Sequence, residues 1–310
     1  MNGAQIVDSN KKILVLHADR AERSILDPIV NELSSRKVSH MYVDLSKQIN
    51  QIHKDKNLSK IYDYCFELTE QHNFNFVIVI GDRREITFAC LAFFTQQIPV
   101  YQMASGDLSS EMSLVDDYYR HLITIMSSKQ ISFSKKSLKT TNDLLSKLNI
   151  SADSTYYANP TLNDISINDE ALFPQPYDLI LLHPQSLSYD GTCADLQTVL
   201  SLINPSKTTI IIKGNKDKNY EVYYDAWQQL SQQPNFKIYE NVEKQKFINL
   251  LRNADRFISN SSCTYYEAPI FLSEDKIIRI GRRNKNREIV DYKIQEIKSA
   301  SNIVDFMLGT

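Results

Sequence analysis

The segment FVIVIGDRRE, residues 76–85, decides the fold prediction. Its first half, Phe76–Ile80, is an uninterrupted apolar run, which is typical of a parallel strand buried on both faces. The run stops at the polar loop Gly81-Asp82-Arg83, and a helical pattern follows over residues 85–95. A strand, a short loop and a helix in this order predict one unit of a parallel α/β sheet.

The same alternation of strand and helix continues on both sides of this segment. We expect further strands at residues 12–17, 38–45, 99–103, 130–133, 178–183, 208–213, 236–239, 256–259 and 276–280. We expect helices at residues 20–33, 58–71, 135–148, 193–202, 220–232, 243–253 and 264–271. The pattern predicts an α/β protein with two Rossmann-like, doubly wound parallel sheets.

The polar segment 161–176, which contains two prolines and no periodicity, is interpreted as a linker between two domains. The N-terminal domain is then expected at residues 1–160 and the C-terminal domain at residues 177–290. Residues 291–310 are expected to form a terminal helix that packs back on the first domain.

The composition excludes several classes of protein. A formal net charge of −2 gives no electrostatic case for a nucleic-acid partner. No apolar run approaches the roughly 18–20 residues needed to span a bilayer, and residues 1–12 do not resemble a signal peptide. The four cysteines lack C-x-x-C spacing, which indicates neither a zinc site nor a disulfide framework. We therefore expect a cytoplasmic protein.

Acidic side chains follow the expected strands 76–80 and 99–103 and open the next helix, and a basic pair lies close by. These residues are Asp82, Asp107, Asp116, Asp117, Arg120 and His121. Ligands of open α/β sheets bind at the carboxyl ends of the strands. We therefore expect these side chains at one edge of the first sheet, as a site for proton chemistry.

The second half of the chain has polar segments at corresponding places. Asn260-Ser261-Ser262 follows a strand, and it is typical either of a phosphate site or of an ordinary helix N-cap. His183, the segment 213–217 and the basic segment 281–287 also follow strands, and each is equally compatible with a solvated loop. No D-x-D motif occurs and the histidines do not cluster with carboxylates, so no metal is expected.

Taken in order, these segments resemble the UDP-N-acetylglucosamine 2-epimerase family, most closely its hydrolysing branch. Residues 81–85 stand where the family has GDR-x-E, and residues 116–124 look like its D-[DE]-x-x-R-H-x-I-T segment. The series is completed by Asn159-Pro160, His183-Pro184, Asn260-Ser261-Ser262 with Glu267, and Gly281 followed by Arg283 and Arg287. The resemblance extends from Ile13 to about Arg287.

The resemblance implies a GT-B arrangement with the active site in the cleft between the domains. It implies a cytoplasmic enzyme that takes a UDP-sugar, needs no cofactor, and releases UDP and an N-acetylmannosamine-type sugar for sialic acid biosynthesis. It also implies a homodimer.

The resemblance further assigns roles to single residues. Acid and base positions fall on Asp82, Asp107 and Asp116, with Asp117 as the neighbouring candidate and His183 near the diphosphate or sugar. Ser261 and Ser262 would hold the diphosphate, and Glu267 the ribose hydroxyls. The remaining substrate-binding candidates are Arg20, Arg83, Glu85, Arg120, His121, Gly214, Asn215, Arg283 and Arg287.

Several segments depart from the family pattern, among them residues 281–287, where the family has G-D-R-Q-K-G-R. The family's H-I-H-G-G-E is replaced by QMASGD at residues 102–107, and its N-S-S-S-G by NSSCT at residues 260–264. Three alternatives therefore stay open: a non-hydrolysing epimerase, a GT-B glycosyltransferase, and a nucleotide-sugar-binding protein without catalysis. Only one of the adjacent acids is expected to face the sugar, because neighbours on a helix project about 100° apart. The family's spacing from the acidic residue after Gly106 favours Asp116.

Overall fold

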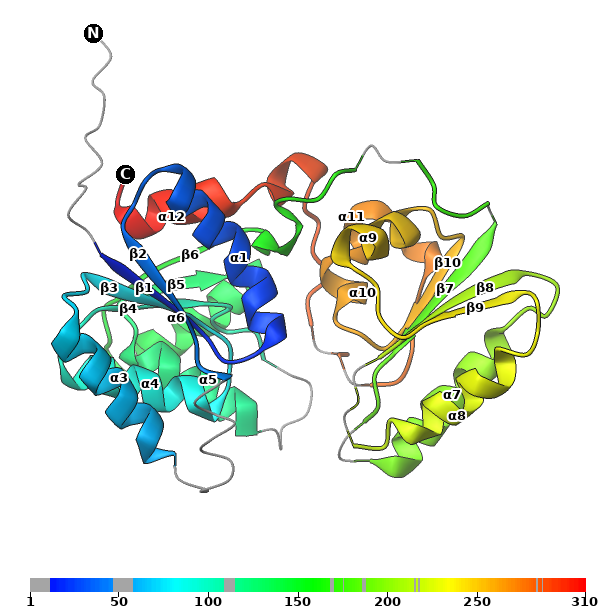
Figure 1. The fold of residues 1–310 in the computed structure, drawn as a ribbon, viewed down its shortest axis with the longest axis horizontal. Helices are drawn as coiled ribbons and strands as arrows, with labels where there is room; N and C mark the ends of the chain where they lie inside the picture. Colours follow the sequence, from blue (N-terminus) through cyan, green and yellow to red (C-terminus); the bar gives the residue numbers. More distant parts are fainter. Residues whose placement is uncertain are drawn as a thin grey trace, which may run out of the picture. The chain divides into compact units, whose positions relative to one another are not determined.

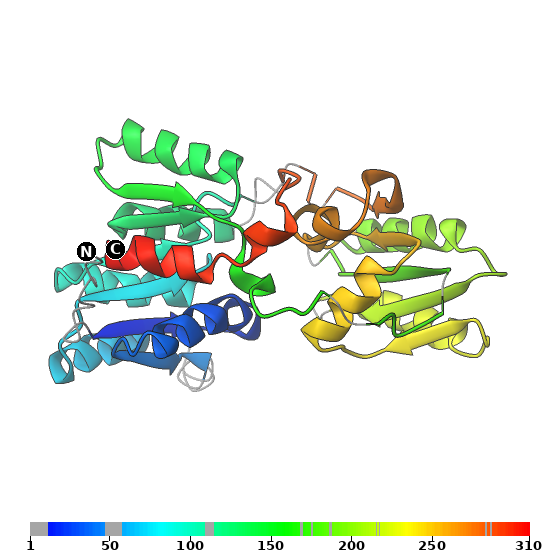
Figure 2. The same cartoon turned by 90° about the horizontal axis from the view of Figure 1, so that it is seen from above.

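A computed structural model describes residues 12–46, 58–108, 115–167, 170–174, 176–185, 188–214, 216, 218–282, 284–285 and 287–310. The chain forms two compact units (Figures 1 and 2). Of the described residues, those up to 164 and 294–310 belong to unit 1, and residues 165–293 belong to unit 2. No helix in the described part of the chain is both long and apolar enough to cross a membrane.

Unit 1 contains a six-stranded, fully parallel sheet in the order β2-β1-β3-β4-β5-β6. The strands are β1 (Ile13–His17), β2 (His40–Asp44), β3 (Phe76–Ile80), β4 (Val100–Met103), β5 (Lys129–Ser132) and β6 (Asp153–Tyr156). The first five were predicted from their apolar character. β6 was not predicted, because this edge strand is polar and only partly buried.

Helices cover both faces of the unit 1 sheet (Figure 1). Alternate β1 residues Ile13 and Val15 pack with α1 (Arg20–Ser35) and α12 (Ala300–Leu308). Leu14 and Leu16 pack on the other face, in a core that includes α3 (Ser59–Gln71), α4 (Arg84–Thr95) and α5 (Val115–Met126). Burial on both faces explains why β3 is apolar at every position. Helix α6 (Lys135–Lys147) follows β5.

The C-terminal segment packs on unit 1 through polar and apolar contacts. Arg36, the residue directly after α1, donates from Nη1 to Oδ1 of Asp305 at 2.5 Å, and the Lys129 ammonium donates to the carbonyl of Phe306 at 2.7 Å. The α-helix begins at Ala300, not near residue 291, and a 3₁₀ turn, Ile294–Ile297, precedes it.

Unit 2 contains a five-stranded parallel sheet in the order β11-β10-β7-β8-β9. The strands are β7 (Tyr177–Leu182), β8 (Thr208–Lys213), β9 (Phe236–Tyr239), β10 (Arg256–Ser259) and β11 (Ile277–Arg279). Helices α7 (Tyr189–Leu202) and α8 (Glu221–Leu230) lie on one face, with Trp227 fully buried between α8 and the sheet. The fold class predicted from the sequence, two doubly wound parallel sheets, is confirmed.

The opposite face of this sheet carries α9 (Lys244–Arg252), α10 (Cys263–Tyr266) and α11 (Ala268–Phe271) (Figure 1). A single helix was expected over residues 264–271, but the helix is interrupted at Glu267. Pro269 lies in the first turn of α11. Because proline has no N–H to donate, it can begin a helix but interrupts the hydrogen bonding of a continuous one.

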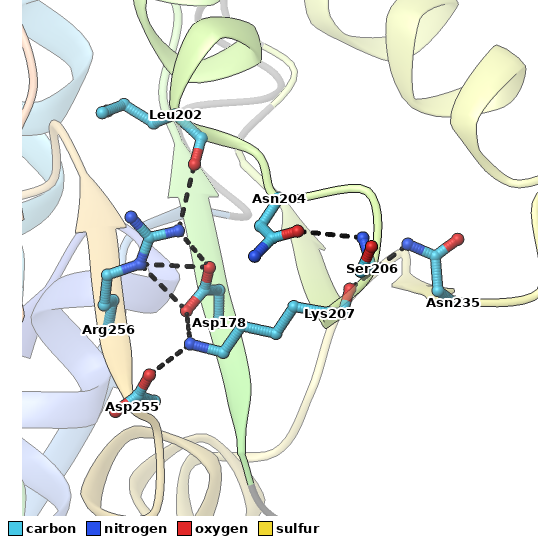
Figure 3. Close-up of polar contacts among 8 residues, drawn as sticks. All are labelled: Asp178, Leu202, Asn204, Ser206, Lys207, Asn235, Asp255 and Arg256. Atoms are coloured by element: carbon cyan, nitrogen blue, oxygen red, sulfur yellow. Dashed lines mark hydrogen bonds and ion pairs between the residues drawn. The ribbon is translucent and has the colours of Figure 1, made fainter.

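An ion-pair network lies at the amino end of the unit 2 sheet (Figure 3). Asp178, only 1% exposed, receives hydrogen bonds from the Arg256 guanidinium and the Lys207 ammonium. Lys207 also pairs with Asp255. This buried carboxylate links β7, β10 and the start of β8, at the end of the strands opposite to the candidate site.

Candidate active site

The loops that follow β1 and β3 in unit 1 are tied together by Asp19. Its Oδ1 accepts the backbone N–H of Glu22 at 2.8 Å, which caps α1, and its Oδ2 lies 3.3 Å from Nε of Arg83. Asp19 thereby places Arg83 and the adjacent Asp82 beside the start of α1. Arg20, a predicted substrate-binding residue, is the first residue of that helix.

Arg120 connects the loop after β3 to the loop after β4. Its side chain is buried; Nη2 donates to Oδ2 of Asp82, and Nη1 donates to the carbonyl of Ala104 at 2.5 Å. Ala104 has a positive φ of 60°, an uncommon conformation for a residue with a Cβ. Arg120 was predicted to bind substrate; in the structure its guanidinium orients Asp82 and holds a strained turn.

Gln102, which replaces the first histidine of the family segment, belongs to the core. It is completely buried, its Oε1 accepts the Thr124 hydroxyl at 2.7 Å, and its Nε2 donates to the Arg120 carbonyl at 3.2 Å. These bonds hold α5 against β4 and so position the helix that carries Asp116. The sequence signal was a polar residue inside an apolar strand.

The start of α5 brings a second carboxylate to Asp82. Burial raises the pKa of Asp116, and the negative charge of Asp82 raises it further, while Arg83 and Arg120 lower it. The neighbouring Asp117 also acts on His121, one helical turn further along, whose pKa is lowered by burial and raised by that carboxylate. Asp116 therefore lies within electrostatic reach of Asp82, and Asp117 within reach of His121.

Two further predicted residues also lie at or near this sheet edge. Asp107 follows the turn 104–106 and is partly buried. Glu85, in the first turn of α4, is almost fully buried, and its Oε1 accepts from Nε of Arg84 at 3.0 Å. The edge thus gathers several carboxylates and guanidinium groups, a composition suited to general acid–base chemistry.

Glu22 is a site residue that the sequence analysis did not single out. Its side chain is buried, Oε2 accepts the backbone N–H of Ala18 at 2.5 Å, and Oε1 has no hydrogen-bond partner. Burial raises its pKa to about 8, and the charges of Asp19 and Asp82 add to the rise. The local sequence carried no signal for this, because a glutamate in a first helical turn is ordinary.

In unit 2, Asn260 joins the carboxyl ends of β10 and β7. Its side-chain amide donates to the carbonyl of His183 and accepts that residue's N–H, both at 2.8 Å. The same amide donates to Oδ2 of Asp195 at 3.0 Å. Asn260 and Asp195 thus position the backbone of His183, a role that the sequence analysis did not identify.

Gly214 is required by the close approach of β8 to β7. A Cβ at this position would lie 2.0 Å from the carbonyl oxygen of Leu182 and 3.0 Å from Nδ1 of His183. The structure therefore places Gly214 beside His183, as a contact that any larger residue would disturb. The candidates Asn215 and Arg283 lie outside the described residues.

The two serines before α10 differ in their surroundings. Ser261 is buried, and its Oγ accepts the N–H of Cys263 at 3.4 Å. Ser262 is the N-cap residue, is partly exposed, and makes no side-chain capping bond. The capping interpretation therefore does not describe Ser262, which leaves its hydroxyl uncommitted to the helix.

Glu267 separates α10 from α11. Burial raises its pKa to about 7, while the positive charges of Lys244 and Arg287 lower it. Arg287 donates from Nη1 to the hydroxyl of Tyr266 at 3.0 Å. The carboxylate and the two cations form a polar group beside the serine segment. Within the described residues, no group of three or more potential metal ligands occurs.

Comparisons with known sequences agree with one family. A profile described as UDP-N-acetylglucosamine 2-epimerase matches residues 8–305. The chain is 25% identical to GDP/UDP-N,N'-diacetylbacillosamine 2-epimerase (hydrolyzing) of Campylobacter jejuni, over 94% of this chain and 87% of that protein. It is 21% identical to polysialic acid biosynthesis protein P7 of Escherichia coli, over 92% and 83% of the two chains.

Solved structures share the fold. UDP-GlcNAc 2-epimerase from Neisseria meningitidis, bound to UDP-GlcNAc, matches with a TM-score of 0.75 at 18% identity, over 96% of this chain and all of that one. The enzyme from Methanocaldococcus jannaschii, in complex with UDP-GlcNAc and UDP, matches with a TM-score of 0.71 at 16% identity and the same coverage. Because the profile match spans nearly the whole sequence, the chain belongs to the UDP-N-acetylglucosamine 2-epimerase family.

Proposed function

We propose that the protein is a hydrolysing UDP-N-acetylhexosamine 2-epimerase, which converts the UDP-sugar and water into free UDP and a 2-epimerised N-acetylhexosamine. The observation that carries the proposal is that Asp82 and Asp116 lie within electrostatic reach of each other at the carboxyl edge of the unit 1 sheet, in a chain of this family. The two carboxylates have different surroundings, because Asp82 is ion-paired with Arg120. Different surroundings are what separate a base from an acid.

The proposed reaction has two steps. In the first, a carboxylate removes the C2 proton while the C1–O bond to the diphosphate breaks, which gives a 2-acetamidoglucal and UDP. In the second, water adds its hydroxyl group to C1, and an acid delivers a proton to C2 on the face opposite to the one that lost it. Asp82, Asp116 and Asp107 are the proposed acid and base groups, and no redox step is involved.

The nucleotide end of the substrate is assigned to unit 2. Ser262 and Ser261, directly after β10, supply hydroxyl and backbone N–H groups for the diphosphate, whose departure donors of this kind stabilise. Glu267 is proposed to accept hydrogen bonds from the ribose hydroxyls. His183, held by Asn260, is proposed to act near the diphosphate or the sugar.

The sugar is proposed to be a 2,4-diacetamido sugar or a close relative of N-acetylglucosamine. Support comes from the Campylobacter relative and from a Legionella pneumophila protein, UDP-N,N'-diacetylbacillosamine 2-epimerase (hydrolyzing), which is 24% identical over 73% of this chain and 61% of that protein. The polysialic acid protein of E. coli points to the same kind of amino-sugar pathway.

The test is incubation of the protein with UDP-GlcNAc, and separately with the UDP-linked diacetamido sugar, in D₂O, followed by NMR. The proposal predicts free UDP and a released sugar of inverted C2 configuration with deuterium at C2, because that proton comes from solvent. An epimer that is still attached to UDP would establish the non-hydrolysing reaction instead. Turnover only with an added acceptor would indicate a glycosyltransferase, and saturable binding without turnover would indicate a binding protein.

A cytoplasmic homodimer is the second part of the proposal. All four cysteines are free and three are buried, which suits a reducing compartment. Five of the nine large apolar side chains exposed among the described residues lie on the neighbouring helices α4 and α5: Leu91, Phe94, Val115, Tyr118 and Leu122. An apolar surface of this kind is typical of an interface between protein chains.

The dimer can be tested by sedimentation velocity. The double substitution Leu91→Glu with Phe94→Glu places charge on the α4 surface and is expected to give a monomer. Leu148→Glu, at an equally exposed apolar position after α6, is the matched control and should stay dimeric. A wild-type protein that sediments as a monomer across the micromolar range would reject this part of the proposal.

A further inference from the structure

The Glu22 carboxyl group lies between the loop after β1 and the loop after β3, which carries the proposed catalytic residue Asp82. On one side, Oε2 accepts the N–H of Ala18, directly after β1. On the other side, Oε1 faces Gly81, directly after β3: a Cβ on Gly81 would lie 2.5 Å from that oxygen. Gly81 has a φ of +99°, so the glycine is needed both for its conformation and for the space that Glu22 occupies.

The burial of this carboxyl group, with a single hydrogen-bond donor beside it, favours its neutral form. An ionised carboxylate offers two acceptor oxygens, and leaving one of them buried without a donor is costly. A neutral carboxyl group has no charge to remove from water, and its Oε2 still accepts the Ala18 N–H. The charged groups that act on it are Asp19, Asp82 and Arg83, and Glu22 in turn acts on the Cys90 thiol. Two of the three are negative, which also disfavours ionisation.

We propose that Glu22, as a neutral carboxylic acid, is a positioning residue of the proposed epimerase reaction: it holds the Gly81–Asp82 turn against the end of β1, and its ionisation disables the site. This inference rests on the proposed function. Ionisation would place a negative charge beside Asp82 and oblige Oε1 to find a donor. Both effects would displace the Gly81–Asp82 turn, and Asp82 would then lose the position in which it contacts Arg120.

The kinetic test compares pH–rate profiles of the wild type, Glu22→Gln and Glu22→Asp. Glutamine keeps the shape and cannot ionise, so kcat at pH 7 should stay within about threefold of the wild type while the decline of the wild-type rate near pH 8 disappears. Aspartate withdraws the group from Gly81 by about 1 Å, which should lower kcat about 10²-fold and leave UDP affinity unchanged. Glu32→Gln, farther along α1, is the matched control and should keep the wild-type profile.

Two outcomes overturn the proposal. A Glu22→Gln enzyme whose kcat at pH 7 falls by more than about 10²-fold would show that the ionised group takes part in proton transfer. A Glu22→Gln enzyme that keeps the wild-type alkaline decline would show that the protonation state of Glu22 does not matter. Thermal denaturation of each variant separates these results from a failure to fold.

A second readout does not depend on activity. Protein labelled with ¹³C at the glutamate side-chain carboxyl carbons is titrated by NMR, and the Glu22 signal is the one missing from Glu22→Gln. A midpoint near pH 8 is expected, and a midpoint below pH 6 contradicts the proposal. If the wild type turns over no UDP-sugar, the proposed function fails, while this titration still decides the state of Glu22.

Discussion

The guanidinium of Arg120 donates to the carboxylate of Asp82, although 38 positions separate the two residues in the sequence. The same guanidinium donates to the Ala104 carbonyl, so one side chain joins the loops after β3 and β4. In the proposed reaction this contact orients the Asp82 carboxylate for proton transfer with the sugar. The two acceptors are reached by two different nitrogens, Nη1 and Nη2, in the fixed planar geometry of the guanidinium group.

Replacing Arg120 tests this role. We expect Arg120→Lys to lower kcat about 10–10²-fold with little change in UDP affinity, because a single ammonium nitrogen does not reproduce the spacing and planar geometry of Nη1 and Nη2. Arg120→Ala should in addition lower the free energy of unfolding by about 2–3 kcal/mol, a value reduced because Asp82 is partly exposed. Steady-state kinetics, UDP calorimetry and urea denaturation measure the three effects. Wild-type kcat in the lysine variant would contradict the positioning role.

The adjacent acids Asp116 and Asp117 are expected to give different phenotypes. Asp116→Asn should abolish deuterium incorporation at C2 and retain UDP affinity, because the amide cannot transfer the proton. Asp117→Asn should change the pKa of His121 and the protein's stability more than the rate. Deuterium exchange at C2 in D₂O and thermal melting, measured for both variants, decide which of the two residues is catalytic. Reversed phenotypes would move the catalytic assignment to Asp117.

The serine segment of unit 2 offers a test of diphosphate binding. Ser262→Ala should weaken UDP binding by about 1–2 kcal/mol and leave the melting temperature of the free protein unchanged, because the hydroxyl makes no capping bond. Ser261→Ala should also destabilise the free protein, because its buried hydroxyl accepts the Cys263 N–H. Calorimetry and thermal melting of both variants are the measurements. Unchanged UDP affinity in both variants would show that this segment does not bind the diphosphate.

Glu22 should make stability depend on pH. Its pKa rises on folding from 4.5 to about 8, so the folded state binds an extra proton between these values. The stability associated with this group is therefore complete below about pH 4.5 and is lost as the pH rises towards 8. The melting temperature of Glu22→Gln minus that of the wild type should therefore be larger at pH 8.5 than at pH 5. The increase should be about 2–4 °C for each kcal/mol recovered. An equal difference at both pH values would show that the wild-type group titrates normally.

The network around Asp178 should contribute to stability but not to activity. Asp178→Asn leaves Arg256 and Lys207 without their shared, buried anion, so we expect a loss of about 3–5 kcal/mol in the unfolding of unit 2. Chemical denaturation measures this loss, and UDP affinity should stay within about twofold where the protein is folded. Lys139→Ala removes an exposed ion pair and should change stability by less than about 1 kcal/mol.

Part of the candidate site could be predicted because it depends on local patterns. Asp82 follows an apolar run that is typical of a buried strand, and Asp116 opens an amphipathic helix, so both residues were expected at helix or strand ends. The edge strand β6 could not be found in this way: Asp153–Tyr156 is polar, and its strand conformation comes from backbone bonds to β5.

By itself, the sequence determined the two parallel sheets, most of their strands and the carboxyl edges at which polar residues gather, because apolar runs and the glycine-containing loops that end them act over a few residues. Only the tertiary structure decided that Gln102 is a core residue, that Asn260 clamps His183, and that Glu22 is buried against Gly81. These roles depend on hydrogen-bond partners and neighbouring charges that lie up to 77 positions away along the chain. The burial and the partners of a polar side chain are properties of the packed fold, and no local pattern encodes them.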